Sequence, residues 1–450
     1  MKTPTKSGFV SSIVFAVAVP ILVAAQSQAQ PQSEQTYYVV RGLSSLGGSQ
    51  GGANGVPDDG SVTGWSNLSG DQIEHAVLWR DQTAIDLGTL GGPNSASSFP
   101  GTNTQGVVVG NSQTADTDPL GENFCTFGTY TSYLCRGFRW QNGTMTALPT
   151  LGGNNSWATG VNHRGQIGGF AETTPDPNCI APQVFDFEAV IWGPKAGDMQ
   201  ALPPYPGDAV GSVFGLNDRG QAVGGSGICE SWTPFLYTHA LLWQHGSVTN
   251  LGSLGGLVST ALFINNRGEV VGASELAGDL VYHAFFWTRD RHMQDLGTLP
   301  GDSVSSAESI NEKSQAAGVS CDQNGNCRAA LWQNGVATDL NSLVLPGTSL
   351  YLVNASDIND RGEIAGYAYD PNTGDSPGFL AIPCDSEHAE VEDCRGQLDR
   401  TSAEAYGSSA GALASGILLS SSFSSLLPAR KFANTWSEAS RKSTFPGRAQ

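Results

Sequence analysis

The chain has 450 residues, enough to bury a large core, and it carries 22 basic and 41 acidic residues. Its formal net charge of −19 at pH 7 repels nucleic acid phosphates and anionic lipid headgroups, so we expect neither as a partner. High acidity is also an ordinary route to solubility, and it does not by itself identify a ligand.

Residues 1–29 have the pattern of a secretory signal peptide. Lys2 and Lys6 precede an uncharged run from Ser7 through Ala25, which ends in small residues at cleavage spacing. This run is too short and wrongly flanked for a stable membrane span. We therefore expect an extracellular, periplasmic or cell-surface protein with no membrane span in its mature body. Its eight cysteines should pair as disulfides rather than bind zinc.

The mature chain repeats three short motifs in a fixed order. The first ends in Trp, as in "AFFW" at Ala284–Trp287, and the second is "INNRGEVVG" at Ile264–Gly272. The third is "LGTLPG" at Leu296–Gly301. Each motif occurs seven times when degenerate copies are included, and the last copy of the first motif, Gly378–Ala381, has lost its Trp. Such self-similarity indicates a repeat architecture.

Each motif has a direct physical interpretation. Asn-x-Arg-Gly between apolar runs predicts a tight hairpin, because Asn bonds its own backbone and Gly accepts a positive φ. "HAFFW" and its copies are continuously apolar, which indicates a strand covered on both faces. Gly-Gly and Pro-Gly pairs separate the units. We therefore expect about four short strands per repeat and no sustained helix.

The two ends of the repeat region predict how it closes. The first segment, Tyr37–Leu43, resembles the last strand of a unit, whereas the last segment, "GFLAIP", belongs to a unit that lacks its last strand. We expect an all-β, seven-bladed propeller of four-stranded blades over residues 36–383, in which the N-terminal strand completes the blade begun near residue 350. This closure removes the exposed sheet edge.

The histidine before the Trp motif is predicted to have a structural role. His283 is replaced in other copies by Arg136, Glu188, Arg328 or Pro377. A metal ligand or general base would not tolerate these exchanges. We expect His283 to cap a strand end, with its imidazole bonded to backbone or water.

The combination of His-Ala-Phe-x-Trp, Asp-Leu-Gly-Thr-Leu and Ile-Asn-x-x-Gly-x-Val-Val-Gly resembles the HAF family of probable extracellular bacterial repeats. The best copies are His283–Gly301 and Ile264–Gly272. The resemblance covers most of the mature chain. It implies bacterial export and a β-rich repeat fold, and it implies no catalytic or binding residues.

Repeats two to four carry enlarged loops between the "VVG" strand and the Trp strand, with 27, 20 and 16 residues against 11 or 12 elsewhere. Aromatic residues in these loops are candidate anchors for a glycan or a protein. The candidate ligand-binding residues are Tyr130, Tyr133, Trp232 and Phe235. Alternatively, the loop aromatics, which include Phe124, Phe127, Phe185, Phe187 and Tyr237, form small cores under their own loops.

The cysteines favour four local pairs, although sequence alone does not fix connectivity. The proposed pairs are Cys125 with Cys135, Cys179 with Cys229, Cys321 with Cys327, and Cys384 with Cys394. The last pair would close a C-terminal loop over residues 384–400. Residues 401–450 form a Ser-rich tail that we expect to be disordered, with a weak C-terminal anchor as the alternative.

Signals for chemistry are weak. The chain has no paired-His zinc motif, P-loop or dinucleotide fingerprint. The Gly-x-Ser copies, such as Ser226 and Ser274, are exchanged for Ala in two repeats and are interpreted as small residues where strands crowd. Calcium could bind at the acidic turns 116–123 and 370–375, although ordinary turns explain both. We expect no other cofactor.

These observations predict an exported, non-catalytic and monomeric binding scaffold whose ligand is a glycan or an extracellular protein. The alternative is a propeller enzyme, a hydrolase or lyase of extracellular polysaccharide, with Glu122, Asp176 and Glu230 as candidate acids or bases. A third hypothesis is a structural protein held at the cell surface by its tail.

Overall fold

The computed structural model describes residues 1, 35–127, 132–175, 184–195, 197–229, 237–278, 281–391 and 394. By its contacts the chain divides into two units, Met1–Gln35 and Thr36–Gln450, and every described strand belongs to the second unit. The predicted signal peptide, except for Met1, and the predicted tail lie outside the described residues.

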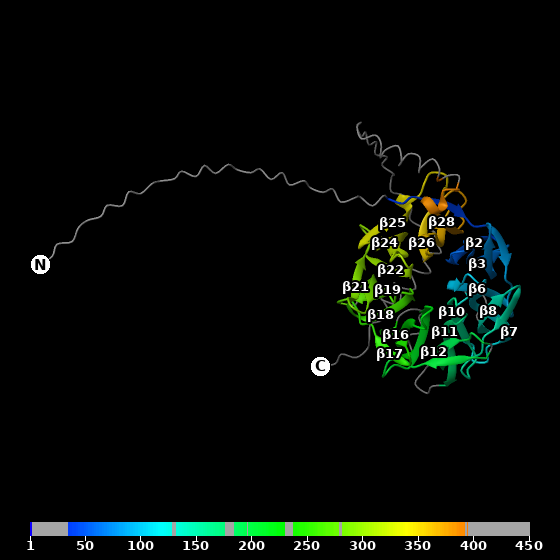
Figure 1. The fold of residues 1–450 in the computed structure, drawn as a ribbon. Helices are drawn as coiled ribbons and strands as arrows, with labels where there is room; N and C mark the ends of the chain where they lie inside the picture. The colour runs from blue at the N-terminus through cyan, green and yellow to red at the C-terminus, as the bar shows by residue number, and fades with distance from the viewer. Residues whose placement is uncertain are drawn as a thin grey trace. The chain divides into compact units, whose positions relative to one another are not determined.

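The described residues form seven four-stranded antiparallel sheets in a ring, which is a seven-bladed propeller (Figure 1). Blade 1 contains β2 (Gly47–Gly55), β3 (Val62–Leu68), β4 (Glu74–Arg80) and β5 (Thr83–Asp86). Blade 2 contains β6 (Gly91–Thr102), β7 (Val108–Thr117), β8 (Tyr133–Gln141) and β9 (Thr144–Ala147). Blade 3 contains β10 (Ser156–Val161), β11 (Ile167–Pro175), β12 (Phe185–Trp192) and β13 (Met199–Leu202).

The remaining blades follow the same order. Blade 4 contains β14 (Val210–Leu216), β15 (Ala222–Gly227), β16 (His239–Gln244) and β17 (Ser247–Asn250). Blade 5 contains β18 (Gly255–Ile264), β19 (Val270–Leu276), β20 (Tyr282–Thr288) and β21 (His292–Gly297). Blade 6 contains β22 (Val304–Ile310), β23 (Ala316–Cys321), β24 (Cys327–Gln333) and β25 (Val336–Asp339). Blade 7 contains β26 (Tyr351–Ile358), β27 (Ile364–Tyr369), β28 (Gly378–Pro383) and β1 (Tyr38–Gly42).

The predicted closure is present in blade 7. Strand β1 pairs with β28 in antiparallel register from Tyr38 opposite Pro383 to Gly42 opposite Phe379. Tyr38 is buried, and its carbonyl oxygen accepts the amide of Leu345 at 2.8 Å. The first strand of the ring therefore completes the last blade, as its sequence predicts.

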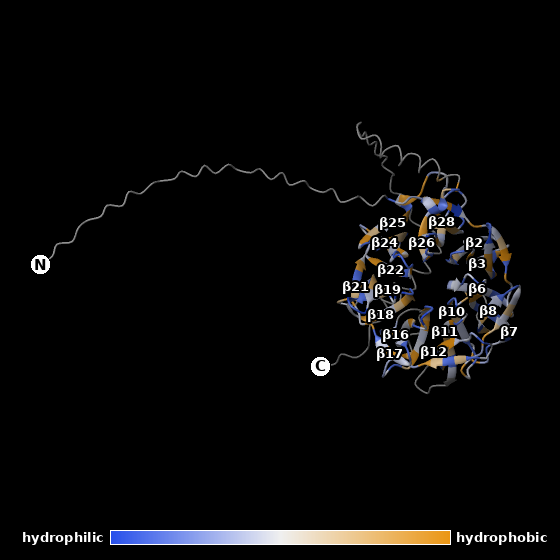
Figure 2. Cartoon of the chain, in the orientation of Figure 1, coloured by the Kyte–Doolittle hydropathy of each residue, from blue (hydrophilic) through white to orange (hydrophobic). Residues whose placement is uncertain are grey.

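The hydrophobic core lies between blades rather than inside any one of them. One cluster joins Val223 and Leu242 of blade 4 to Ile264, Phe285 and Trp287 of blade 5, and equivalent clusters join the other neighbours. Figure 2 shows hydrophobic residues in strands all around the ring. Each repeat Trp is buried, as expected for the covered strand. Burial of apolar area drives this packing, so a single blade has nothing to pack against by itself.

The turns between the first and second strands of each blade adopt the predicted hairpin. Gly165 has φ +74°, a conformation that L side chains disfavour, and Gly220 has φ +77°. Ser314 takes the same place in blade 6 with φ +57°. Because each blade is antiparallel, these turns and the hairpins between the third and fourth strands lie at one edge of the ring. We call this edge the turn face.

The Gly-x-Ser serines do more than the sequence predicts. The hydroxyl of Ser226 accepts the amide of Tyr205 at 3.1 Å, and that of Ser274 accepts the amide of Leu254 at 2.9 Å. Such bonds hold the connection that enters each of the five blades that carry this serine. The serines are small residues among crowded strands, but their hydroxyl groups also fix the connections between blades.

Three of the proposed disulfides are present: Cys125–Cys135, Cys321–Cys327 and Cys384–Cys394. Cys229 is also disulfide-bonded, but its proposed partner Cys179 lies outside the described residues. Cys384 and Cys394 pack against Val39 of β1. The described part of the C-terminal loop therefore covers the strand that closes the ring.

We predict that replacing both Cys384 and Cys394 with Ser lowers the free energy of unfolding by about 2–3 kcal/mol, because the bridge fixes the loop that covers β1. Urea denaturation of the full chain measures this change. Replacing both Cys321 and Cys327 is the control. That bridge joins residues already paired in one hairpin, so we expect a smaller effect. An equal or larger effect in the control would contradict the role of the C-terminal loop.

Candidate functional site

An asparagine begins the turn between the first two strands of most blades, and all its hydrogen-bonding groups are used. In blade 4, the Oδ1 of Asn217 accepts the backbone amides of Arg219 at 3.0 Å and Gln221 at 3.1 Å. Its Nδ2 donates to Oε1 of Gln221 at 2.8 Å and to the carbonyl oxygen of Asn265 in blade 5 at 2.9 Å. One side chain thus shapes its own turn and links two blades.

The same link recurs at six of the seven interfaces between described blades. The donors and acceptors are Asn103 to Asn162, Asn162 to Asn217, Asn217 to Asn265, Asn265 to Asn311, Asn311 to Asn359, and Asn359 to Pro57. In blade 1 the position is Pro57, which has no side-chain donor. In most repeats Gln or Glu follows the Gly of this motif, because its side chain accepts a hydrogen bond from the second Nδ2 proton of the asparagine. The motif alone did not predict this partner.

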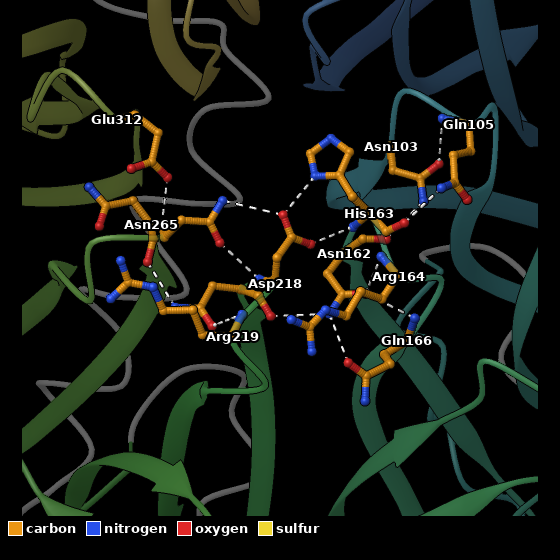
Figure 3. A network of polar contacts seen from close by, with 12 residues as sticks. Asn103, Gln105, Asn162, His163, Arg164, Gln166, Asp218, Arg219, Asn265 and Glu312 are labelled. Carbon is orange, nitrogen blue, oxygen red and sulfur yellow. Dashed lines mark hydrogen bonds and ion pairs between the residues drawn. The ribbon is translucent and has the colours of Figure 1, made fainter.

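The residue after each asparagine forms a second ring of bonds. Figure 3 shows Asp218 of blade 4 accepting the backbone amide of His163 through Oδ1 at 2.9 Å and the His163 Nδ1 through Oδ2 at 3.1 Å. The carboxylates of Glu312, Asp360 and Asp58 accept the amide of the preceding blade in the same way. Those bonds run from Asn266 to Glu312 at 2.6 Å, from Glu312 to Asp360 at 2.7 Å, and from Asp360 to Asp58 at 3.0 Å.

These turns enclose an axial cavity of about 140 Å³ that residues from all seven blades line. Five carboxyl groups line it. Four belong to the turns, those of Asp58, Asp218, Glu312 and Asp360, of which Asp58 is exposed and the others are half-buried, and the fifth is that of the buried Asp357. His163 also lines it. The arginines of the same turns do not line the cavity. We name this feature the acidic mouth; its charge favours a cationic group.

The signal that could have found the acidic mouth is the variable position of the Asn-x-Arg-Gly motif. That position is polar in every copy, and it is acidic in four. The residues are Asp58, Thr104, His163, Asp218, Asn266, Glu312 and Asp360. The repeats predict equivalent places for these side chains in every blade, but the sequence alone does not show that the turns point to the axis.

Two buried carboxyl groups lie on the first strands of blades 6 and 7: Asp357 itself lines the mouth, and Glu308 lies two residues before the lining residue Ile310. Burial raises the pKa of Asp357 to about 6, against hydrogen bonds from Ser309 Oγ at 2.6 Å and the Val56 amide at 2.8 Å. Burial raises the pKa of Glu308 to about 8, against a hydrogen bond from Asn354 Nδ2 at 3.0 Å. Desolvation therefore dominates both groups.

The described loop aromatics form small cores. Phe124 and Phe127 are buried with the Cys125–Cys135 disulfide and pack against Trp157 and Phe170. Phe187 and Tyr237 are also buried, and Tyr237 Oη lies 2.5 Å from Ser212 Oγ. This matches the alternative interpretation of these loops. Phe185 is half-buried, and so is the candidate Tyr133 at the start of β8, whereas Tyr130, Trp232 and Phe235 lie outside the described residues, so their role stays a prediction.

Glu122, a candidate residue of the enzyme alternative, has a structural environment. It is 1% exposed, and its Oε1 accepts the amide of Val184 at 2.8 Å. Burial and the nearby Asp118 raise its pKa, and Asn155 Nδ2 donates to Asp118 at 2.9 Å and lies 3.5 Å from Glu122. The cluster fastens the enlarged loop of blade 2 to blade 3. Asp176 and Glu230 lie outside the described residues.

The two acidic turns considered for calcium use their carboxylates in turn bonds. Asp118 Oδ1 accepts the amide of Leu120 at 2.7 Å, and Asp370 Oδ1 accepts that of Asn372 at 2.9 Å. In the part of the chain that the structure describes, no group of three His, Cys, Asp or Glu side chains could hold a metal ion. Calcium at these turns stays a prediction.

The repeat histidines pair with carboxylates through Nδ1, a partner that the expectation for His283 did not include. Its Nδ1 lies 3.0 Å from Asp295, and His75 lies 2.9 Å from Asp86 in the same arrangement. In blade 6, Arg328 takes the place of the histidine and contacts Asp339 at 3.1 Å. The Asp of the Asp-Leu-Gly motif is the partner in blades 1, 5 and 6, whereas His239 of blade 4 pairs with Asp208 at 2.8 Å. The role is structural.

Comparisons with known proteins give little beyond this geometry. No family model matches the chain, and no curated protein matches it. TolB from Acinetobacter baumannii is 11% identical with a TM-score of 0.38, over 69% of this chain and 76% of that chain. A mutant Aleuria aurantia lectin in complex with Fucalpha1-6GlcNAc is 8% identical with a TM-score of 0.32, over 78% and 96%.

A dipeptidyl peptidase 4 from Porphyromonas gingivalis is 9% identical with a TM-score of 0.35, over 79% of this chain and 61% of that chain. These TM-scores are below 0.5, so the likenesses carry no argument about function, and the assignment of a propeller rests on the strand pairing. Among the described residues, no helix is long and apolar enough to span a membrane.

We predict that Asn217→Asp lowers the free energy of unfolding by about 2–3 kcal/mol, because Asp keeps the acceptor but loses both Nδ2 donors. Asn250→Asp is the matched control. Asn250 lies where other repeats carry Asp, and its Oδ1 accepts only the Gly252 amide among the bonds described. Chemical denaturation measures both variants, and equal effects would contradict the role of the link between blades.

We predict that Glu308 makes the protein less stable as pH rises from about 5 to 8. In this range the folded state keeps a proton on Glu308, whose pKa is about 8, and the unfolded state has released it. The stability of the Glu308→Gln variant should lack this pH dependence. Between pH 5 and pH 8, the difference in free energy of unfolding between variant and parent should therefore shift in favour of the variant by on the order of 3 kcal/mol. Denaturation at several pH values measures the difference, and parallel curves would refute the assignment.

Proposed function

We propose that the protein is an exported, non-catalytic binding scaffold that holds a basic segment of a partner protein at its acidic mouth. The observation that supports this proposal is the convergence of four turn carboxylates, beside the buried Asp357, on one axial cavity of about 140 Å³. A Lys or Arg side chain fits such a cavity by charge and by its narrow shape.

The carboxylates are oriented before any partner arrives. Glu312, Asp360 and Asp58 each receive a backbone amide from the preceding blade at 2.6–3.0 Å. Because these bonds fix one oxygen of each group, little conformational entropy is lost when a cation binds the other. The net charge of −19 also attracts a basic partner from a distance, which raises the rate of association.

Export is part of the proposal. Three disulfides among the described residues are typical of an oxidising compartment, and the N-terminal pattern is that of a signal peptide. The motifs support membership of the HAF repeat family. The enzyme alternative has weaker support, because Glu122 fastens one loop to the next blade.

A binding experiment with a matched control tests the acidic mouth. The ring variant carries Asp58→Asn, Glu312→Gln and Asp360→Asn, which keep the amide acceptors and remove three charges. The control variant carries Asp81→Asn, Asp198→Asn and Asp290→Asn, in exposed hairpins at the outer part of the turn face. Both variants change net charge equally.

We predict that the ring variant binds a fluorescent lysine-rich peptide at least about tenfold more weakly than the parent, while the control changes affinity by less than about twofold. Fluorescence anisotropy at physiological salt measures the dissociation constants. Equal weakening in both variants would show attraction by overall charge alone, and unchanged binding by the ring variant would reject the site.

A further inference from the structure

A second cavity, of about 180 Å³, lies at the edge of the ring opposite to the turn face. It lies at the seam where blade 7 meets blade 1. One wall is the connection from β1 to β2, and the other is the loop between β27 and β28. We call it the seam cavity.

Backbone hydrogen bonds build the seam cavity from segments more than 300 residues apart. The amide of Gly51 donates to the carbonyl oxygen of Ser376 at 2.8 Å, and the amide of Ser376 donates to the carbonyl oxygen of Ser49 at 2.9 Å. On the blade 1 side, Asp71 Oδ1 accepts the Ser49 amide at 2.7 Å. Both walls are therefore held in place, and the cavity exists only because the ring closes.

The lining is rich in oxygen acceptors and carries no basic side chain. Its polar groups include the hydroxyls of Ser44, Ser45 and Thr373 and the carboxylates of Asp370 and Asp375. The Oε1 of Gln50, which also lines the cavity, is buried and has no hydrogen-bond partner among the described residues. A buried acceptor without a partner costs free energy, which a donor on a ligand recovers. Such a lining repels anions and suits a ligand with several hydroxyl donors.

The volume of the seam cavity and its apolar lining restrict the class of ligand further. A volume of about 180 Å³ holds several water molecules, far more than a bare metal ion needs. Leu43, Trp79 and Pro377 supply apolar surface beside the polar groups. A sugar ring presents hydroxyl donors around its rim and C–H groups on its faces, which matches this mixture.

We propose that the seam cavity binds one neutral sugar residue, free or at the end of a glycan, with Gln50 and Asp375 accepting its hydroxyl protons. The site is independent of the acidic mouth, since the two lie at opposite edges of the ring. It also differs from the enlarged loops of blades 2–4, which belong to other blades.

Saturation-transfer NMR on the full chain tests the proposal with five neutral sugars: D-glucose, D-galactose, D-mannose, L-fucose and N-acetyl-D-glucosamine. D-glucuronic acid is the anionic comparison. We expect at least one neutral sugar to bind and glucuronic acid to give no signal. Gln50→Leu removes the unpartnered acceptor with little change in volume, and it should weaken binding of that sugar about tenfold.

Gln333→Leu, at an exposed position of β24, is the matched control and should leave sugar binding unchanged. A thermal melt of Gln50→Leu confirms that the variant is folded. The proposal fails if no neutral sugar binds, if Gln50→Leu binds as well as the parent, or if binding requires added calcium. The parent and Gln50→Leu should bind the lysine-rich peptide with the same affinity. The proposals for the acidic mouth and the seam cavity are therefore tested separately.

Discussion

No blade of this protein can bury its own hydrophobic side chains, and this constraint governs the rest of the structure. Phe285 and Trp287 of blade 5 share a buried cluster with Val223 and Leu242 of blade 4, and each other interface has an equivalent cluster. A sheet with one uncovered face gains stability only from a neighbour, and a row of such sheets leaves two uncovered ends. A closed ring removes both ends, and the pairing of β1 with β28 completes it.

The hydrogen bonds that link the turns of neighbouring blades also form the acidic mouth. Five of the six turn asparagines that link described blades use one Nδ2 proton for their own turn and the other for the next blade, as Asn217 does with Gln221 and Asn265. The residue after it is carried onto the axis, where a backbone amide from the preceding blade fixes it. The hydrogen bonds between blades and the charge of the acidic mouth therefore come from adjacent positions of one motif. The asparagine is constrained by packing, whereas the next position is free to vary and sets the charge of the mouth.

Much of the fold could be predicted from the sequence, because repeats reveal strand number, turn position and closure without any long-range information. The structure confirms the seven blades and the role of Tyr38 in completing the last one. The side-chain partners and the residues that build the two cavities could not be predicted in the same way. The partner of His283 is Asp295, in the next strand, and the motif gave no reason to prefer a carboxylate over water. The seam cavity joins Gln50 to Asp375, and no spacing rule connects positions so distant in the chain. The sequence of a loop does not show whether an aromatic side chain such as Phe124 is exposed or buried, because that depends on neighbours that are distant in the chain.

The pairing of β1 with β28 has a consequence for biosynthesis. The strand that leaves the ribosome first must wait for a partner made roughly 340 residues later, which takes on the order of 20–70 s at ordinary elongation rates. During that interval β1 is an unpaired edge strand, and the last blade cannot form. The ring therefore stays open, with its last blade incomplete, until β28 has been synthesised.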